Sequence, residues 1–297
     1  MEKPNLIDPR TLYTDGPFPD QEQDTPAIQD DMRPEPDCGE KSYQGNNRLK
    51  HRNALITGGD SGIGRAAAIA YAREGANVAI QFFPGEEEDA EEVKALIEAE
   101  GGKALLMAYD LRDEKAATNI VEETIEAFGQ LDILVLNAAQ QIAQDSLSDL
   151  SVKQIEDTFK VNVISMFETV KAAESHLKPG SAIITTTSVQ SFDPSPTLMD
   201  YAATNGAVSN LTVNLAQYFA EKGVRVNGVA PGPIWTPLQL DQGQPKGKIP
   251  TFGQNAPLGR AGQPAELAPV YVFLASNEAS YVTSQIYGVT GGSPINL

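Results

Sequence analysis

The chain has 297 residues, and its 40 acidic residues outnumber its 22 lysines and arginines, which gives a formal net charge of −18. This charge repels nucleic-acid phosphates and anionic lipid surfaces, and no apolar run reaches the ~18 residues needed to cross a bilayer. We therefore expect no nucleic-acid partner and no membrane partner.

Cysteine and histidine are scarce. Cys38 is the only cysteine, and the opening residues contain no apolar secretion signal, so we expect no internal disulfide and a reducing, cytoplasmic location. The two histidines, His51 and His176, form no cluster with Cys38 at metal-ligand spacing. The sequence predicts no metal site.

Residues 1–50 differ in composition from the rest of the chain. Prolines recur between residues 4 and 36 and interrupt any helical or strand period, with acidic residues between them. A solvated tail has the same composition, but it would not need the apolar side chains of Leu12, Tyr13, Phe18, Ile28 and Met32. We predict an extended arm that lies along the body of the protein or along a neighbouring subunit.

From residue 51 onward, short apolar runs alternate with longer segments of helical period, which is the pattern of β-α-β units in a parallel sheet. Continuous apolar runs at 133–136 and 182–184 are typical of central strands that are buried on both faces. The sequence predicts a single doubly wound α/β domain over residues 51–297 with seven parallel strands. The predicted strands are 54–57, 78–82, 104–108, 133–136, 182–186, 225–229 and 286–289.

A glycine-rich turn joins the first predicted strand to the first helix. Residues 57–64 read Thr-Gly-Gly-Asp-Ser-Gly-Ile-Gly and run directly into an alanine-rich helical stretch at 65–70. Glycines let the backbone approach a ligand closely, and the free amides at the start of a helix attract an anion. This turn is therefore a candidate site for a pyrophosphate.

The segment from Gly59 to Gly62 can also be compared with the surroundings of a nucleophilic serine. The G-x-S-x-G pattern of serine hydrolases fails, because Ile63 stands where the second glycine is required. His51 precedes the first strand and His176 lies near a helix end, so neither is an evident base for Ser61. We reject the hydrolase interpretation.

Other polar residues follow the predicted strands in a fixed order: Asp110, Asn137, Asn162, Ser188, Tyr201 and the segment Pro-Gly-Pro-Ile at 231–234. With the glycine turn, they make the chain from about residue 50 resemble the short-chain dehydrogenase/reductase family. Within that family it is similar to bacterial glucose/ribitol dehydrogenase-like oxidoreductases with a proline-rich N-terminal extension. The resemblance implies a Rossmann-type domain, a nicotinamide coenzyme and a small alcohol or carbonyl substrate.

The resemblance also implies a role for each matching residue. Tyr201 would be the general acid/base, Ser188 would hydrogen-bond the substrate oxygen, and Asn162 would position a water in the proton path. Hydride transfer itself belongs to the coenzyme, NAD or NADP. The implied coenzyme-binding residues are Thr57, Gly58, Asp60, Ser61, Gly62, Ile63, Gly64, Asp110, Leu111, Asn137, Pro231, Gly232, Ile234 and Thr236.

One family position differs in this chain. The family has a lysine four residues after the tyrosine, and here Asn205 stands in that place. One helical turn brings positions 201 and 205 together, so a lysine would favour the tyrosinate form of Tyr201, and Asn205 cannot. A unit charge at ~4 Å with an effective dielectric of about 20 is worth about 4 kcal/mol, or roughly three pKa units. A smaller departure is Ala139, where the family pattern has glycine.

Three explanations of Asn205 stay open. The chain is a natural variant with slow or altered chemistry, an enzyme disabled by a deliberate substitution, or a dinucleotide-binding protein that no longer turns over. In each case we expect coenzyme binding to persist and ordinary turnover to be depressed.

The sequence does not decide between NAD and NADP. An acid at the end of the second strand normally binds the NAD ribose, whereas an arginine accommodates the NADP phosphate, and the strand here ends Gln-Phe-Phe at 81–83. The acids at 86–89 read as the solvated start of a helix. Arg65 is too ambiguous to offset them.

The remaining expectations concern substrate and assembly. Residues 232–262 are rich in Pro, Gly and Gln and read as a mobile lid. By their positions, Gln140, Gln141, Gln190 and Phe192 would shape a pocket for a sugar, a polyol or a small aldehyde. The family resemblance further implies a homotetramer, in which helices near 151–178 and 201–222 pair between subunits.

Overall fold

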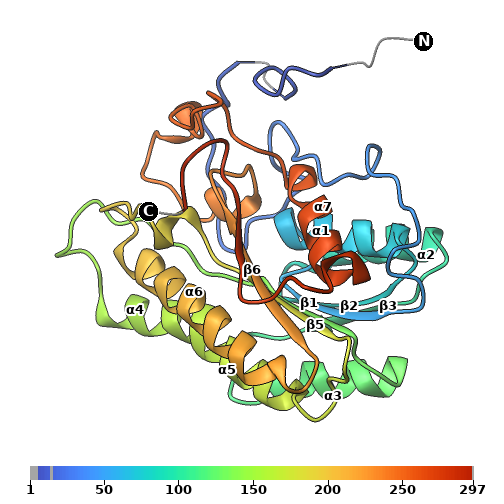
Figure 1. The fold of residues 1–297 in the computed structure, drawn as a ribbon. Helices are drawn as coiled ribbons and strands as arrows, with labels where there is room; N and C mark the ends of the chain where they lie inside the picture. The colour runs from blue at the N-terminus through green and yellow to red at the C-terminus, as the bar shows by residue number, and fades with distance from the viewer. Residues whose placement is uncertain (1–5, 14–15, 296–297) are drawn as a thin grey trace.

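Seven parallel strands form the centre of the fold, in the order β3-β2-β1-β4-β5-β6-β7. The computed structural model describes residues 6–13 and 16–295 (Figure 1). The predicted parallel sheet is confirmed, and each observed strand contains the predicted one. The strands are β1 (Asn53–Thr57), β2 (Asn77–Phe82), β3 (Ala104–Ala108), β4 (Ile133–Leu136), β5 (Ala182–Thr186), β6 (Arg225–Pro231) and β7 (Ile286–Val289).

Two strands begin one residue earlier than predicted, and β6 ends two residues later. The extension of β6 has a visible cause, because Ala230 and Pro231 pair with Gly288 and Val289 of β7. The strand order reverses between β1 and β4, where β4 follows β1 in space although β2 and β3 lie between them in sequence. Ligands of doubly wound sheets bind beyond the carboxyl ends of the strands at such a point.

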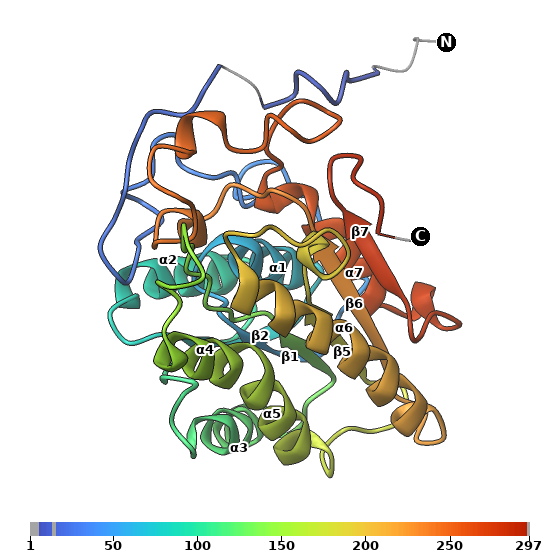
Figure 2. The same ribbon diagram turned by 90° about the vertical axis from the view of Figure 1, so that its left-hand side faces the viewer.

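Helices cover both faces of the sheet (Figures 1 and 2). One buried cluster joins α1, α2 and α7 to the sheet, and a second joins α3, α5 and α6 to the opposite face. None of the helices in the described ranges is long and apolar enough to cross a membrane. The helices are α1 (Gly62–Arg73), α2 (Glu87–Ala99), α3 (Ala116–Phe128), α4 (Val152–Phe159), α5 (Ser165–Ala173), α6 (Met199–Ala220) and α7 (Ala268–Ala275).

The N-terminal arm packs against the body of the protein, which is one of the two arrangements that the sequence predicts. Met32 and Leu49 are fully buried, and the ring of Phe18 stacks on Trp235 with centroids 3.9 Å apart. The Trp235 indole N–H donates to the carbonyl of Pro34 at 2.8 Å. Leu12 was expected to be an anchor but is 44% exposed. The first five residues lie outside the described ranges.

A buried carboxylate fixes the last part of the arm to the end of α1. Glu74 accepts hydrogen bonds from the Tyr43 hydroxyl at 2.7 Å and from the backbone amides of Asn46 and Arg48 at 2.8 Å each. The Arg48 guanidinium adds an ion pair at 2.7 Å. Burial alone would raise the pKa of Glu74, but these donors outweigh it and lower the pKa from 4.5 to about 2.

We predict that Glu74→Gln makes the free energy of unfolding less dependent on pH in the acid range. A carboxylate whose pKa is lowered by folding stabilises the native state above pH 4.5, and this contribution is lost as the pH falls toward 2. The shift corresponds to about 3 kcal/mol at pH 7. Urea unfolding at several pH values measures it. Glu98→Gln, at an exposed position of α2, is the matched control. If the free energy of unfolding falls equally steeply with decreasing pH in the Glu74 variant and in the wild type, the prediction is wrong.

Candidate active site

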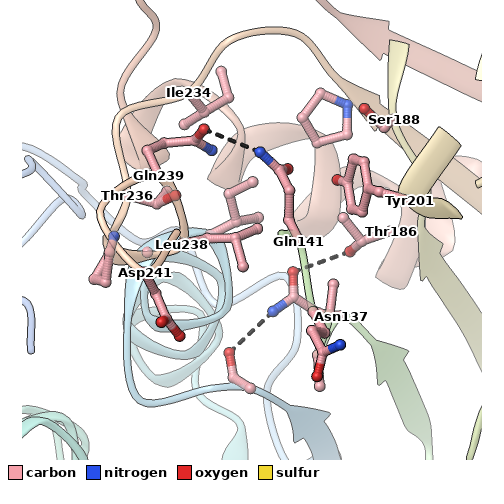
Figure 3. Close-up of a pocket in the computed structure, with 18 of the residues that line it drawn as sticks. Asn137, Gln141, Thr186, Ser188, Tyr201, Ile234, Thr236, Leu238, Gln239 and Asp241 are labelled. Atoms are coloured by element: carbon pink, nitrogen blue, oxygen red, sulfur yellow. Dashed lines mark hydrogen bonds between the residues drawn. The ribbon is translucent and has the colours of Figure 1, made fainter. Parts of the chain in front are cut away.

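A cavity of about 580 Å³ opens at the carboxyl ends of the central strands. Its volume is in the range of small-molecule sites. Most of the predicted site residues line it, and Figure 3 shows part of the wall. Thr57, Gly64 and Asn162 do not line it. The lining includes Gly58, Asp60, Ser61, Gly62, Ile63, Asp110, Leu111, Asn137, Ser188, Tyr201, Asn205, Pro231, Gly232, Ile234 and Thr236.

The glycine turn between β1 and α1 forms one wall and needs its glycines. Gly58 and Gly62 have positive φ values of +61° and +51°. A Cβ on Gly64 would lie 1.8 Å from the carbonyl oxygen of Gly58, which no rearrangement of a side chain could relieve. The turn therefore brings unhindered backbone and the start of α1 to the cavity, an arrangement that suits an anionic diphosphate.

Asn137, just after β4, joins two neighbouring strand ends. Its side-chain amide donates to the carbonyls of Thr57 at 3.2 Å and Gly58 at 2.9 Å, and its oxygen accepts from the Thr186 hydroxyl at 3.1 Å (Figure 3). The Thr57 hydroxyl in turn accepts from the amides of Asn137 and Ala138. These hydrogen bonds tie the ends of β1 and β5 to the chain just after β4.

Ser188 and Tyr201 lie side by side on the cavity wall (Figure 3). Ser188 follows β5, and Tyr201 is the third residue of α6. Burial raises the pKa of the Tyr201 phenol, and the side chains of Ser188 and Asn205 lower it by less. The phenol is therefore protonated at neutral pH, ready to donate a proton but a poor acceptor.

Asn205 is 5% exposed and lies one turn after Tyr201. Its amide nitrogen donates to the Tyr201 carbonyl at 2.9 Å, so the side chain is tied to its own helix. Arg112 is the only lysine or arginine among the described lining residues, and it is paired with Asp110 at 2.6 Å. No cation of the described wall replaces the missing lysine.

Asn162 makes structural hydrogen bonds that the sequence did not predict. It lies in a π-helical segment, Lys160–Ile164, inserted between α4 and α5; such single turns often mark functional positions. Its amide donates to the carbonyl of Gln140 at 3.0 Å and to the Thr204 hydroxyl at 3.1 Å, while its oxygen accepts from the Gln140 amide at 2.7 Å. These bonds fix the chain just after β4. The role of Asn162 toward a water stays a prediction.

The expected substrate side of the cavity is rich in neutral amides. Gln140, Gln141 and Gln190 line it as expected, but Phe192 does not. Figure 3 shows Gln141 beside Gln239, which comes from the segment read as a lid. The segment 232–262 packs against the N-terminal arm, because its Trp235 is fully buried there. Sequence reasoning also missed Thr25 and Ala27 of the arm, which line the cavity.

The arm also holds the glycine turn directly. Gln29 is fully buried, and its side-chain oxygen accepts from the Gly62 amide at 2.9 Å. Its own backbone amide donates to Asp89 of α2 at 2.8 Å. No short-range pattern signals these contacts, because Gly62 and Asp89 lie 33 and 60 residues away from Gln29 in sequence.

Comparison with known families identifies a single matching model over most of the chain. Residues 58–293 match the family described as Enoyl-(Acyl carrier protein) reductase. The matched region begins inside the glycine turn. It includes Asn162, Ser188, Tyr201 and Asn205.

Similar proteins come from bacteria and plants. The chain is 57% identical to the uncharacterized oxidoreductase YhxD of Bacillus subtilis, over 99% of both chains. It is 44% identical to the glucose and ribitol dehydrogenase homolog 2 of Arabidopsis thaliana, over 94% of this chain and 98% of the other. A short-chain dehydrogenase of Burkholderia cenocepacia, solved in complex with NADP, superimposes with a TM-score of 0.77 at 33% identity. That match covers 82% of this chain and 98% of the other.

We predict that Gln29→Ala destabilises the protein by about 1–3 kcal/mol, because it leaves the buried Gly62 amide without an acceptor. Chemical denaturation measures the change. Gln44→Ala, an exposed glutamine of the same arm, is the control and should alter the free energy of unfolding by less than about 0.5 kcal/mol. Equal effects of the two substitutions would show that the contact between the arm and the glycine turn is not stabilising.

Proposed function

Because the chain belongs to the short-chain dehydrogenase/reductase family, we propose that it moves a hydride between a nicotinamide coenzyme and an alcohol or carbonyl carbon, with a sugar, a polyol or a small aldehyde or ketone as substrate. One observation carries this proposal. Ser188 and Tyr201 share a cavity wall with a glycine turn in which a Cβ on Gly64 could not be accommodated. A diphosphate cradle and a proton donor thus face one cavity.

The glycine turn and the segment around Pro231–Thr236 would hold the coenzyme, which supplies the hydride when it is bound. Asp110 and Leu111 would lie at the adenine, as the family resemblance implies. Ser188 would hydrogen-bond the substrate oxygen, and Tyr201 would give that oxygen a proton during reduction. In the reverse direction Tyr201 would accept a proton from the alcohol.

The neutral amides around the cavity support the substrate class. Glutamine side chains both donate and accept, so Gln140, Gln141 and Gln190 can satisfy several hydroxyl groups without placing a charge near them. An aldose, a polyol or a short aldehyde fits such a wall better than an acidic substrate, since the cavity also contains Asp193 and Asp241.

Turnover is depressed in this proposal because Tyr201 has no cationic neighbour. Burial raises the pKa of its phenol, and the Asn205 amide provides only a hydrogen bond where a lysine would provide a charge. The effect should be greatest in alcohol oxidation, since that direction needs the deprotonated phenol.

We predict that Asn205→Lys increases alcohol oxidation at least 10-fold, which is about 1.4 kcal/mol, and moves its pH profile to lower pH. The direction follows from the charge, because a nearby ammonium lowers the pKa of Tyr201 and yields more tyrosinate at neutral pH. Steady-state rates with aldoses, polyols and short alcohols measure both effects.

Asn214→Lys puts the same charge on an exposed position of α6 and is the matched control. A change below 10-fold in the Asn205 variant would show that this position does not limit turnover. Coenzyme binding without turnover in both the wild type and the variant would favour a dinucleotide-binding protein that is not an enzyme. That alternative draws its support from Asn205 alone.

We also propose a homotetramer in which the α4–α5 and α6 regions pair between subunits. Large apolar side chains stay exposed there, with Phe167 of α5 53% exposed and Tyr218 of α6 56% exposed. Ile164, in the π-helical segment, is 41% exposed. Pairing would remove these side chains from water. Multi-angle light scattering gives the mass in solution, and a monomer would refute the proposal.

A further inference from the structure

A loop of the N-terminal arm forms part of the cavity wall. Residues 23–28 make up this arm loop, and the Gln23 side chain closes it. The Gln23 oxygen accepts from the Ile28 amide at 2.7 Å, and the Gln23 side-chain amide donates to the Ile28 carbonyl at 3.0 Å. Between these two residues, Thr25 and Ala27 line the cavity. Thr25 is exposed, whereas Ala27 is buried, so the arm loop reaches from the surface into the wall.

One side of the arm loop is attached to the glycine turn and to the connection between β2 and α2. Gln29, the residue after the loop, accepts from the Gly62 amide at 2.9 Å. The buried thiol of Cys38, farther along the arm, donates to the Gly62 carbonyl at 3.4 Å. Pro26 packs on Gly85, where an added Cβ would lie 3.0 Å from the proline ring. The arm thus contacts the turn at which the diphosphate would bind.

The other side of the arm loop is attached to the segment 232–262. The backbone amide of Gln23 donates to the Leu240 carbonyl at 3.3 Å. The Thr25 hydroxyl donates to the Asp241 carboxylate. In Figure 2 the arm, drawn in blue, runs beside this segment, drawn in orange. The arm loop therefore joins the coenzyme side of the cavity to the segment on its substrate side.

The contacts on the two sides differ in how easily they can be broken. Gln29 is fully buried, so breaking its bond to Gly62 would leave buried polar groups unpaired. Thr25 is exposed, and its partners Asp241 and Gln242, the latter at 3.2 Å, can bond to water instead. The arm loop can therefore open at Thr25 while it stays attached to the glycine turn.

We propose that the arm loop is the outer wall of the coenzyme site and that it opens at Thr25 whenever the coenzyme enters or leaves. The inference rests on the proposed function, in which the coenzyme extends from the glycine turn along Pro231–Thr236. A ligand in that position lies within the span that the arm loop bridges. The matched family region begins at residue 58, so the arm loop is an addition to the domain that the family shares.

This arrangement has a kinetic signature. A closed arm loop slows entry and exit alike, so weakening its bond to Asp241 should raise the association and dissociation rate constants together. The two effects then cancel in the dissociation constant. A residue that merely contacts the coenzyme would change the dissociation rate and the dissociation constant in parallel. A residue with only a structural role would change neither.

Stopped-flow fluorescence with NADH and with NADPH measures both rate constants without a substrate. We expect Thr25→Ala to raise both at least threefold and to change the dissociation constant less than twofold. Thr11→Ala makes the same substitution at an exposed position of the arm outside the cavity wall, and it should change neither rate constant by more than twofold.

Asp241→Ala removes the same hydrogen bond from its other partner and should also raise both rate constants. Thr25→Ala added to this variant should have an effect below twofold, because the bond is already lost. Rate constants that change less than threefold in the Thr25 variant would overturn the inference. A faster release alone, with proportionally weaker binding, would overturn it too, since Thr25 would then be a ligand contact. If the wild type binds neither coenzyme, the proposed function itself is wrong.

Discussion

The close approach of Gly64 to Gly58 is the constraint on which the site depends. A methyl group at position 64 would lie 1.8 Å from the Gly58 carbonyl oxygen, so β1 can turn into α1 this tightly only with glycine there. The tight turn places the start of α1 at the cavity. It also exposes backbone groups that need partners, which Asn137 supplies from β4 and Gln29 supplies from the arm. Hydrogen bonds thus join the glycine turn, the sheet and the N-terminal arm into one unit.

The sheet and most of the cavity wall could be predicted from the sequence, because both depend on short-range patterns. Apolar runs at 133–136 and 182–184 indicate buried strands wherever they occur, and parallel strands bring the residues that follow them to one edge. The contacts of the arm could not be predicted, since Gln29 and Trp235 find their partners across long sequence separations. The acids at 86–89 do form the start of α2, and Glu87 and Glu88 are exposed as predicted. Glu86 instead lines the cavity and Asp89 is buried, and only the packing of the arm near α2 reveals this.

The shape of the site survives the loss of its lysine because Asn205 satisfies a local requirement of α6. Its amide bonds the Tyr201 carbonyl, and Thr204 beside it anchors Asn162. Stability therefore places little demand on the charge at position 205. At position 205 the fold requires a side chain of suitable size that can form a hydrogen bond, and Asn205 meets this requirement. The proposed chemistry requires a positive charge there, and Asn205 does not provide one.

The charged side chains of the described cavity wall are nearly all acidic, because Arg112 is the one lysine or arginine among them. Asp60 and Glu86 line the cavity near the glycine turn, and Asp193 and Asp241 line it as well, among neutral amides and hydroxyls. A coenzyme anchored by the glycine turn would extend from there toward Tyr201. Position 205 lies beside Tyr201, where a positive charge would meet no described lysine or arginine of the wall other than the paired Arg112 and would act mainly on the phenol.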